Sequence, residues 1–161
     1  MENMTNLYGK HPQVIDAGKT NLSILLYSPD MDFCMSLRLL FQNRYIVRTT
    51  TDPPMLLLMM KEFEPELVIV DGLPTARMKQ WLERIREENP RARIMYFYVP
   101  HFEDQAMRHY ICSAVDAVFS KPVDLEDVTK SVDRLVKAAA SACSCVKSSN
   151  SSPTTLLASH A

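Results

Sequence analysis

Short apolar runs alternate with amphipathic segments along most of the chain, and this alternation constrains its fold more than any other feature. The runs are apolar at consecutive positions, which is typical of strands buried on both faces of a parallel sheet. The segments between them carry apolar residues at helical spacing, so a predicted helix follows each predicted strand. We expect strands over 22–27, 45–50, 67–70, 94–99 and 117–119. We expect helices over 32–43, 53–63, 75–89 and 103–113, and a last one that begins after Asp124.

Helices that connect parallel strands by right-handed crossovers cover both faces of the sheet. The sequence therefore predicts an α/β fold, a doubly wound five-stranded parallel sheet in a three-layer sandwich, which is the flavodoxin-like (βα)5 arrangement. The two ends of the chain are polar and aperiodic. They predict a flexible N-terminal arm over 1–20 and a disordered C-terminal tail over 143–161, with one domain over 21–142 between them.

The composition argues against several classes of function. A formal net charge of −1 gives no electrostatic footprint for nucleic acid or for an anionic membrane surface. No apolar run reaches the roughly 20 residues of a membrane span, and residues 1–10 lack the pattern of a signal peptide, so we expect a cytoplasmic protein. The four cysteines form no CxxC pair, and we interpret them as reduced thiols. For Cys143 and Cys145, near the predicted tail, a redox or lipidation role stays open.

Two charged residues lie just after predicted strands. Asp71 comes after the run 67–70, and Lys121 comes shortly after the run 117–119. In doubly wound folds the working site lies outside the carboxyl ends of the strands, where the strand order reverses. We therefore expect the two side chains to meet in one crevice, where each favours the charged form of the other. An alternative is that Asp71 is a turn residue, paired with Lys121 for stability alone.

The order of elements, the Asp that ends the third strand and the Lys-Pro pair that ends the fifth resemble the receiver domain of two-component response regulators. The resemblance covers about 21–137. It implies that Asp71 is a phosphoacceptor, that Lys121 pairs with the phosphoryl oxygens, and that the Lys121-Pro122 peptide bond is cis. It also implies a signalling partner such as a histidine kinase, and contacts to partners or to a second copy through the last helix and its neighbours.

The sequence departs from the receiver pattern after the first strand. The family carries two adjacent acidic residues there, which hold Mg²⁺. Ser28 and Pro29 occupy those positions here, and neither side chain is a good ligand for the ion. Asp30 and Asp32 lie nearby, so a shifted ligand set that includes Asp30 and Asp71 is an alternative. We expect no cofactor unless the chain is phosphorylated with the help of Mg²⁺.

Further departures affect the family's switch. Val99 stands where receivers have Ser or Thr, and its methyl groups cannot bond a phosphoryl oxygen. Val118 stands where receivers have an aromatic residue that swings inward. The loop 72–74, Gly-Leu-Pro, is one residue shorter than the usual pattern. A phosphoryl group on Asp71 would therefore interact almost equally with the two conformations of the domain. A ligand that binds two conformations equally does not shift the equilibrium between them.

The residues leave three hypotheses for function. The first, which the departures favour, is a stand-alone receiver-like domain that acts by protein–protein interaction, without phosphorylation or enzymatic activity. The second is a working receiver that accepts phosphate on Asp71 from a histidine kinase, with Mg²⁺ as cofactor. The third is a flavodoxin-like binder of flavin or nucleotide. A phosphate cradle usually needs a glycine-rich loop, and Gly72 is the only glycine of the predicted domain, which counts against the third.

Overall fold

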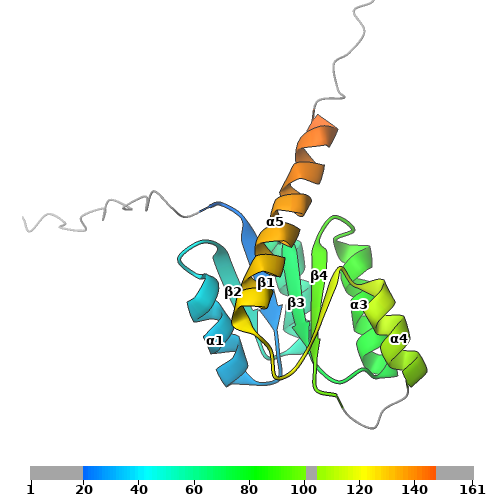
Figure 1. Ribbon diagram of the computed structural model, residues 1–161. Coiled ribbons are helices and arrows are strands. Elements are labelled where there is room, and N and C mark those ends of the chain that lie inside the picture. Colours follow the sequence, from blue (N-terminus) through cyan, green and yellow to red (C-terminus); the bar gives the residue numbers. More distant parts are fainter. Residues whose placement is uncertain (1–19, 101–104, 148–161) are drawn as a thin grey trace, which may run out of the picture.

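Residues 20–100 and 105–147 are described by a computed structural model, with side chains described as far as 142. Strands and helices alternate strictly along this part of the chain (Figure 1). The strands are β1 (Ser23–Tyr27), β2 (Ile46–Thr50), β3 (Leu67–Asp71), β4 (Arg93–Tyr98) and β5 (Ala117–Ser120). The helices are α1 (Met31–Phe41), α2 (Pro53–Phe63), α3 (Ala76–Glu88), α4 (Gln105–Ala114) and α5 (Leu125–Lys147). The predicted alternation is confirmed.

All five strands run parallel, in the order β2-β1-β3-β4-β5. The order reverses at β1 and β3, which lie side by side although α1, β2 and α2 separate them in the sequence. This is the doubly wound arrangement that the sequence predicts, and it opens a crevice where β1 and β3 end. The register sets Tyr27 of β1 beside Val70 of β3, and Asp71 beside Phe97 of β4. Residues that follow these strands therefore meet at one edge of the sheet.

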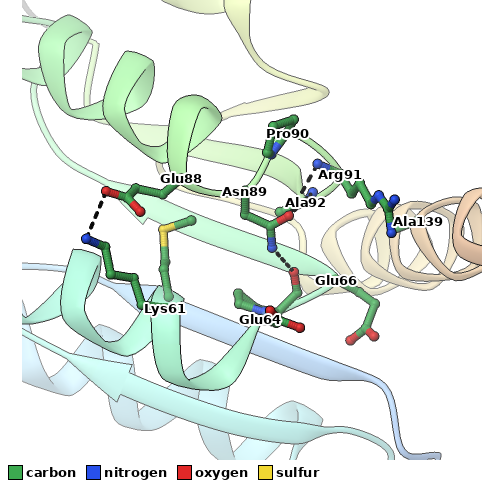
Figure 2. A pocket seen from close by; sticks show the side chains of 11 residues that line it. Lys61, Glu64, Glu66, Glu88, Asn89, Pro90, Arg91, Ala92 and Ala139 are labelled. Atoms are coloured by element: carbon green, nitrogen blue, oxygen red, sulfur yellow. Dashed lines mark hydrogen bonds and ion pairs between the residues drawn. The ribbon is translucent and has the colours of Figure 1, made fainter.

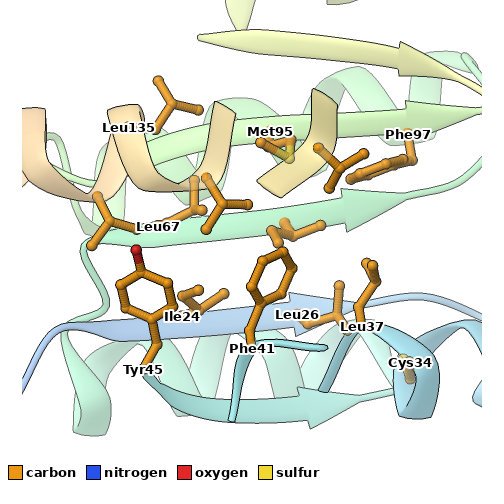
Figure 3. Packing of buried hydrophobic residues seen from close by; sticks show 14 residues of the cluster. Ile24, Leu26, Cys34, Leu37, Phe41, Tyr45, Leu67, Met95, Phe97 and Leu135 are labelled. Atoms are coloured by element: carbon orange, nitrogen blue, oxygen red, sulfur yellow. The ribbon is translucent and has the colours of Figure 1, made fainter. Parts of the chain in front are cut away.

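Both faces of the sheet are buried, which explains why its strands are apolar at consecutive positions. On one face, α1 and α5 cover Ile24 and Leu26 of β1 (Figure 3). On the other face, α2, α3 and α4 cover Leu25, the residue between them. Because adjacent side chains of a strand point to opposite faces, the central strands β1, β3 and β4 need apolar residues at consecutive positions. The predicted three-layer sandwich is confirmed.

Aspartates fix the starts of two helices at the edge where the strands end. Asp30 accepts hydrogen bonds from the backbone N–H groups of Asp32 and Phe33 and so caps α1. Asp124 caps α5 in the same way, as the sequence predicts. Each cap satisfies N–H groups that have no partner inside the helix.

Helix α5 is longer than the sequence predicts. It continues to Lys147, so the expectation of disorder is wrong for residues 143–147. These residues contain neither glycine nor proline, and extending an existing helix by one residue costs little. Within the described ranges, no helix, α5 included, has the length and apolar character that a membrane crossing requires. Three of the predicted features lie outside the described residues: the arm up to 19, the helix start at 103, and the tail from 148.

Asp116, which immediately precedes β5, ties this edge strand to β4 and α3. Its carboxylate accepts hydrogen bonds from the Ile94 backbone N–H at 2.8 Å, from Arg93 at 2.9 Å and from Arg86 at 3.2 Å. Burial alone would raise the pKa of the Asp116 carboxyl, but these hydrogen bonds and the charge of Arg86 outweigh burial and lower the pKa. The fold therefore stabilises the charged form of this side chain.

We expect Asp116→Asn to lower the free energy of unfolding by about 2 kcal/mol at neutral pH, because three donors lose a charged acceptor. Since the folded-state pKa is depressed, this contribution is present above the unfolded-state pKa and is lost as the pH falls through the folded-state value. Urea denaturation at neutral and acid pH measures the free energy of unfolding of both proteins. The difference between wild type and variant should be smaller at acid pH. Glu62→Gln, at an exposed carboxylate of α2, is the control. An equal difference in the free energy of unfolding at both pH values would contradict a stabilising role for the charged Asp116 carboxylate.

Candidate functional site

Side chains at the carboxyl ends of β1, β3 and β5 converge at one point of the crevice. Asp71 is the last residue of β3 and is buried, with 4% of its surface exposed. Lys121 follows β5, and its Nζ lies 2.6 Å from Asp71 Oδ2. Ser28 follows β1, is fully buried, and donates a hydrogen bond from its hydroxyl to the same Oδ2 at 2.6 Å. The structure thus brings Asp71 and Lys121 together as expected, adds Ser28 to them, and has a cis Lys121-Pro122 peptide bond.

The hydrogen bonds to Asp71 are unequal between its two oxygens. Oδ2 accepts from both Ser28 and Lys121, whereas no described residue donates a hydrogen bond to Oδ1. Ser28 in turn accepts a hydrogen bond from the Asp30 backbone N–H at 3.0 Å. One hydroxyl therefore connects the loop after β1 to the end of β3. A hydroxyl donor stabilises the charged carboxylate, whereas a second carboxylate at this point would repel it.

Phe33, in the first turn of α1, covers the ammonium of Lys121. The Nζ lies 3.7 Å from the centroid of the Phe33 ring, so the cation is held between a carboxylate and a π face. The Phe33 ring packs edge-on against Phe97 of β4, with centroids 5.4 Å apart. The predicted helix 32–43 includes Phe33, but its helical spacing does not reveal this contact with Lys121. Asp30 was the sequence signal for it. As a helix-capping residue it predicts that a helix starts directly after the first strand, which places Phe33 in the first turn, beside the site.

Two further titratable side chains near the carboxylate are held in their neutral forms. Burial, followed by the negative charge of Asp71, raises the pKa of Tyr27. Burial also raises the pKa of the Cys34 thiol, whose Sγ lies 3.7 Å from the carbonyl oxygen of Ser28. At neutral pH, neither a phenolate nor a thiolate accompanies the Asp71 carboxylate in this crevice.

The residues of the crevice do not fit a bound Mg²⁺ ion. The Ser28 hydroxyl donates a hydrogen bond to Asp71, Pro29 has no ligand atom in its side chain, and the Asp30 carboxylate caps α1. Asp32 is exposed in the first turn of the same helix. Among the described residues, no three His, Cys, Asp or Glu side chains gather into a group that could hold a metal ion. Mg²⁺ takes oxygen ligands that include carboxylates, and here an ammonium lies against Asp71 instead.

Val99 and Val118 lie near this edge without contributing a polar side-chain atom. Val99 follows β4 and is 47% exposed. Val118 lies within β5 and packs against the cluster under α2, α3 and α4. The aromatic residue of β5 is the next one, Phe119, which packs on the opposite face of the sheet and stacks on Phe97 with centroids 5.4 Å apart. The loss of the switch at these two valines stays a prediction.

Solved structures share this architecture. A structure described as adenylate cyclase from Rhodopirellula baltica has a TM-score of 0.70 and 18% identity, over 83% of this chain and 100% of that one. The signal receiver domain of an HD domain-containing protein from Pseudomonas fluorescens Pf-5 has a TM-score of 0.67 and 19% identity, over 76% and 99%. A two-component response regulator from Clostridium difficile has a TM-score of 0.61 and 18% identity, over 73% and 97%. The chain has the receiver fold.

The likeness to receiver domains concerns the fold alone, since these identities do not exceed 19%. No protein-family model and no curated protein matches the sequence. The expected flavodoxin-like receiver architecture is therefore confirmed. Whether this receiver fold retains phosphoryl chemistry depends on the crevice itself, and the roles of Asp71 and Lys121 stay predictions.

A separate hollow lies at the opposite edge of the sheet, where β3 and β4 begin (Figure 2). It measures about 410 Å³ and lies between the turns 64–66 and 89–92, beside α2 and α5. Several of its polar groups already have partners in the protein. Lys61 pairs with Glu88 at 3.3 Å, and Asn89 donates a hydrogen bond to the Pro65 carbonyl at 3.1 Å. This hollow is separated from Asp71 by the length of the strands and forms no part of the same site.

We expect Lys121→Met to lower the free energy of unfolding by about 3 kcal/mol, because it leaves the buried Asp71 carboxylate without its countercharge. Adding Asp71→Asn removes the uncompensated charge, so the double variant should lose clearly less stability than the two single losses combined. Denaturant unfolding of the four proteins measures this coupling. Lys130→Met, which removes an exposed pair with Glu126, is the matched control and should change little. Additive losses would show that Asp71 and Lys121 are not coupled.

Proposed function

We propose that the chain is a receiver-like signalling domain that acts by binding another protein, without accepting a phosphoryl group on Asp71. The observation that carries this proposal is the hydrogen bond from Ser28 to Asp71 at 2.6 Å. Ser28 stands at a position that is acidic in the receiver pattern, and it contributes a proton donor where a metal site needs a charged oxygen ligand. The carboxylate is stabilised without a divalent cation.

Phosphoryl transfer to a carboxylate brings negative charges together. The transferred group spreads charge over its oxygens, and the reaction depends on cations placed around that group. The cation in contact with Asp71 is Lys121, whose ammonium is already shared between the carboxylate and the Phe33 ring. One ammonium balances the charge of Asp71 itself and leaves little to compensate the incoming group. This charge balance supports a domain that is not phosphorylated.

The residues around the crevice also provide few contacts through which a phosphoryl group on Asp71 could change the conformation of the domain. Val99 presents only methyl groups at the end of β4, and Val118 presents only methyl groups within β5. A ligand shifts an equilibrium only by its differential interaction with the two states, and aliphatic side chains make no hydrogen bond that could differ. We infer that the partner recognises the fold in one resting conformation.

The partner in this proposal is a signalling protein of the cytoplasm, with a histidine kinase as one candidate. The resemblance to receivers implies a contact surface on α5 with β5 and α4, and a homodimer through α5 is a further form of the same idea. The domain itself carries no enzymatic activity in this proposal.

A second candidate function, a receiver phosphorylated on Asp71, is favoured by one specific observation. Oδ1 of Asp71 accepts no hydrogen bond from the described residues, so its lone pairs are available for attack while Lys121 holds Oδ2. In such a step, a new bond would form between Oδ1 and phosphorus as the donor's phosphoryl bond breaks.

We expect no phosphoryl adduct when the protein is incubated with acetyl phosphate and Mg²⁺ and weighed intact by mass spectrometry, because the crevice does not fit the ion. Asp71→Asn, treated in parallel, identifies any modification at other residues. Stoichiometric addition of one phosphoryl group to the wild type, absent from Asp71→Asn, would overturn the proposal and establish the second candidate.

Restoring the acidic pair tests the physical reason. We expect Ser28→Asp/Pro29→Asp to bind Mg²⁺ and to gain phosphorylation by acetyl phosphate, because two carboxylates then adjoin Asp71. Titration followed by backbone NMR shifts near Asp71 reports the ion, and intact mass reports the adduct. Ser28→Asn/Pro29→Ala is the neutral control. If the acidic variant shows neither ion binding nor an adduct, the missing pair does not explain the inactivity.

A further inference from the structure

Large apolar side chains are exposed around one edge of the sheet. Of the eleven that are exposed within the described residues, seven lie on α1, β2 and α2, the three consecutive elements at this edge. The two most exposed of the seven are Leu39, at 60%, and Met31, at 57%, both on α1. Four of the seven lie on the single helix α1, and exposed apolar surface concentrated on one element is a sign of an interaction site.

Three of these residues form a stripe along α1. Met31, Met35 and Leu39 follow one another at intervals of four positions, so they lie on one face of the helix. The stripe faces away from the buried residues of the same helix, which are Cys34, Leu37 and Phe41. Because α1 packs on β2, the stripe runs beside the open edge of the sheet.

The backbone of β2 offers hydrogen bonds at that edge. β2 pairs only with β1 in the described sheet. The Ile46 N–H and the Thr50 C=O both bond toward β1, so residues 46, 48 and 50 face their neighbour strand. Alternate residues of a strand direct their N–H and C=O groups to opposite sides, and those of Val47 and Thr49 therefore point outward.

Two of the usual protections of an edge strand, proline and lysine, are absent from β2, and four of its five residues are β-branched. Its single charge, Arg48, lies over the Phe63 ring, 4.5 Å from the centroid, and so is drawn toward α2 and away from the edge. An extended strand can therefore approach the outward groups of β2.

We propose that this edge is a homodimer interface, in which β2 pairs antiparallel with β2 of a second copy about a two-fold axis near Thr49. Such an axis, perpendicular to the sheet, joins the outward N–H and C=O groups of the two strands and keeps the two α1 helices on the same face. It also sets Arg48 opposite Thr50 of the second copy, so no like charges face each other.

The α1 stripe matches the same axis. Cys34 Sγ lies 3.9 Å from the Thr50 carbonyl oxygen, so Met35 is level with the end of β2 where the axis passes. Met35 then meets its own copy, and Met31 meets Leu39 of the second copy. Equal intervals on both sides of Met35 make the stripe self-complementary about this axis, so a second copy of this chain fits it. This inference goes beyond the proposed function, which concerns α5.

Sedimentation velocity of the full chain over a concentration series tests the interface. We expect a concentration-dependent dimer for the wild type. Leu39→Arg should weaken dimerisation by about tenfold or more, because it sets a charge in an apolar seam. Thr49→Pro should weaken it similarly, because it removes an outward N–H that has no acceptor among the described residues. Leu125→Arg, at a residue of α5 that is 53% exposed, is the matched control and should leave dimerisation unchanged.

Circular dichroism and thermal unfolding check that each variant is folded. Oxidative cross-linking gives a second readout: Met35→Cys should form a covalent dimer beyond the wild-type background, and Leu125→Cys should not. A chain that is monomeric at every concentration would overturn the proposal. So would a dimer that Leu125→Arg dissociates while Leu39→Arg and Thr49→Pro leave it intact, because that dimer would form through α5. Failure of this interface leaves the phosphorylation result unaffected.

Discussion

One buried negative charge governs the carboxyl edge of this sheet. A carboxylate that is withdrawn from water is costly unless opposite charge and hydrogen bonds replace the lost solvation. For Asp71 the replacement comes from Lys121 and Ser28, which both reach Oδ2 at 2.6 Å. Three segments distant in sequence, after β1, at the end of β3 and after β5, are thereby held together. A site with three carboxylates would need a cation to be stable, whereas this one is balanced by its own side chains.

The positions of Asp71 and Lys121 could be predicted because they depend on topology. Parallel strands end at the same edge, so residues that follow β3 and β5 must lie near each other once the apolar runs are assigned to one sheet. The strands were predictable for a related reason, because burial on both faces leaves no polar position in the run. Ile24 faces α1 and α5 while its neighbour Leu25 faces the opposite helices, so β1 shows no alternation of polar and apolar residues. The long-range arrangement therefore followed from local patterns.

The contacts of Ser28 and Phe33 could not be predicted in the same way. Whether a serine accepts or donates, and to which oxygen, depends on distances of a few tenths of an ångström that no periodicity encodes. Phe33 covers Lys121 only because α1 docks with its first turn over the crevice, and a helix-face pattern does not contain that docking angle. The end of α5 escapes prediction for another reason. A polar, serine-rich composition predicts disorder, although residues 143–147 adjoin a helix that already exists and contain no residue that stops it.

The length of α5 has a mechanical consequence. The helix has 23 residues, which corresponds to about 34 Å, and its last buried residue among the described side chains is Ala139. Its final turns therefore project past the sheet as a stiff rod (Figure 1). The base of the rod follows closely on Lys121, so it is anchored beside the carboxylate. Its first turns are not free to tilt, because Val128, Val132 and Leu135 are buried against the sheet. The eight residues beyond Ala139 correspond to about 12 Å of helix. The packed part of α5 therefore sets the direction of this projecting segment relative to the crevice.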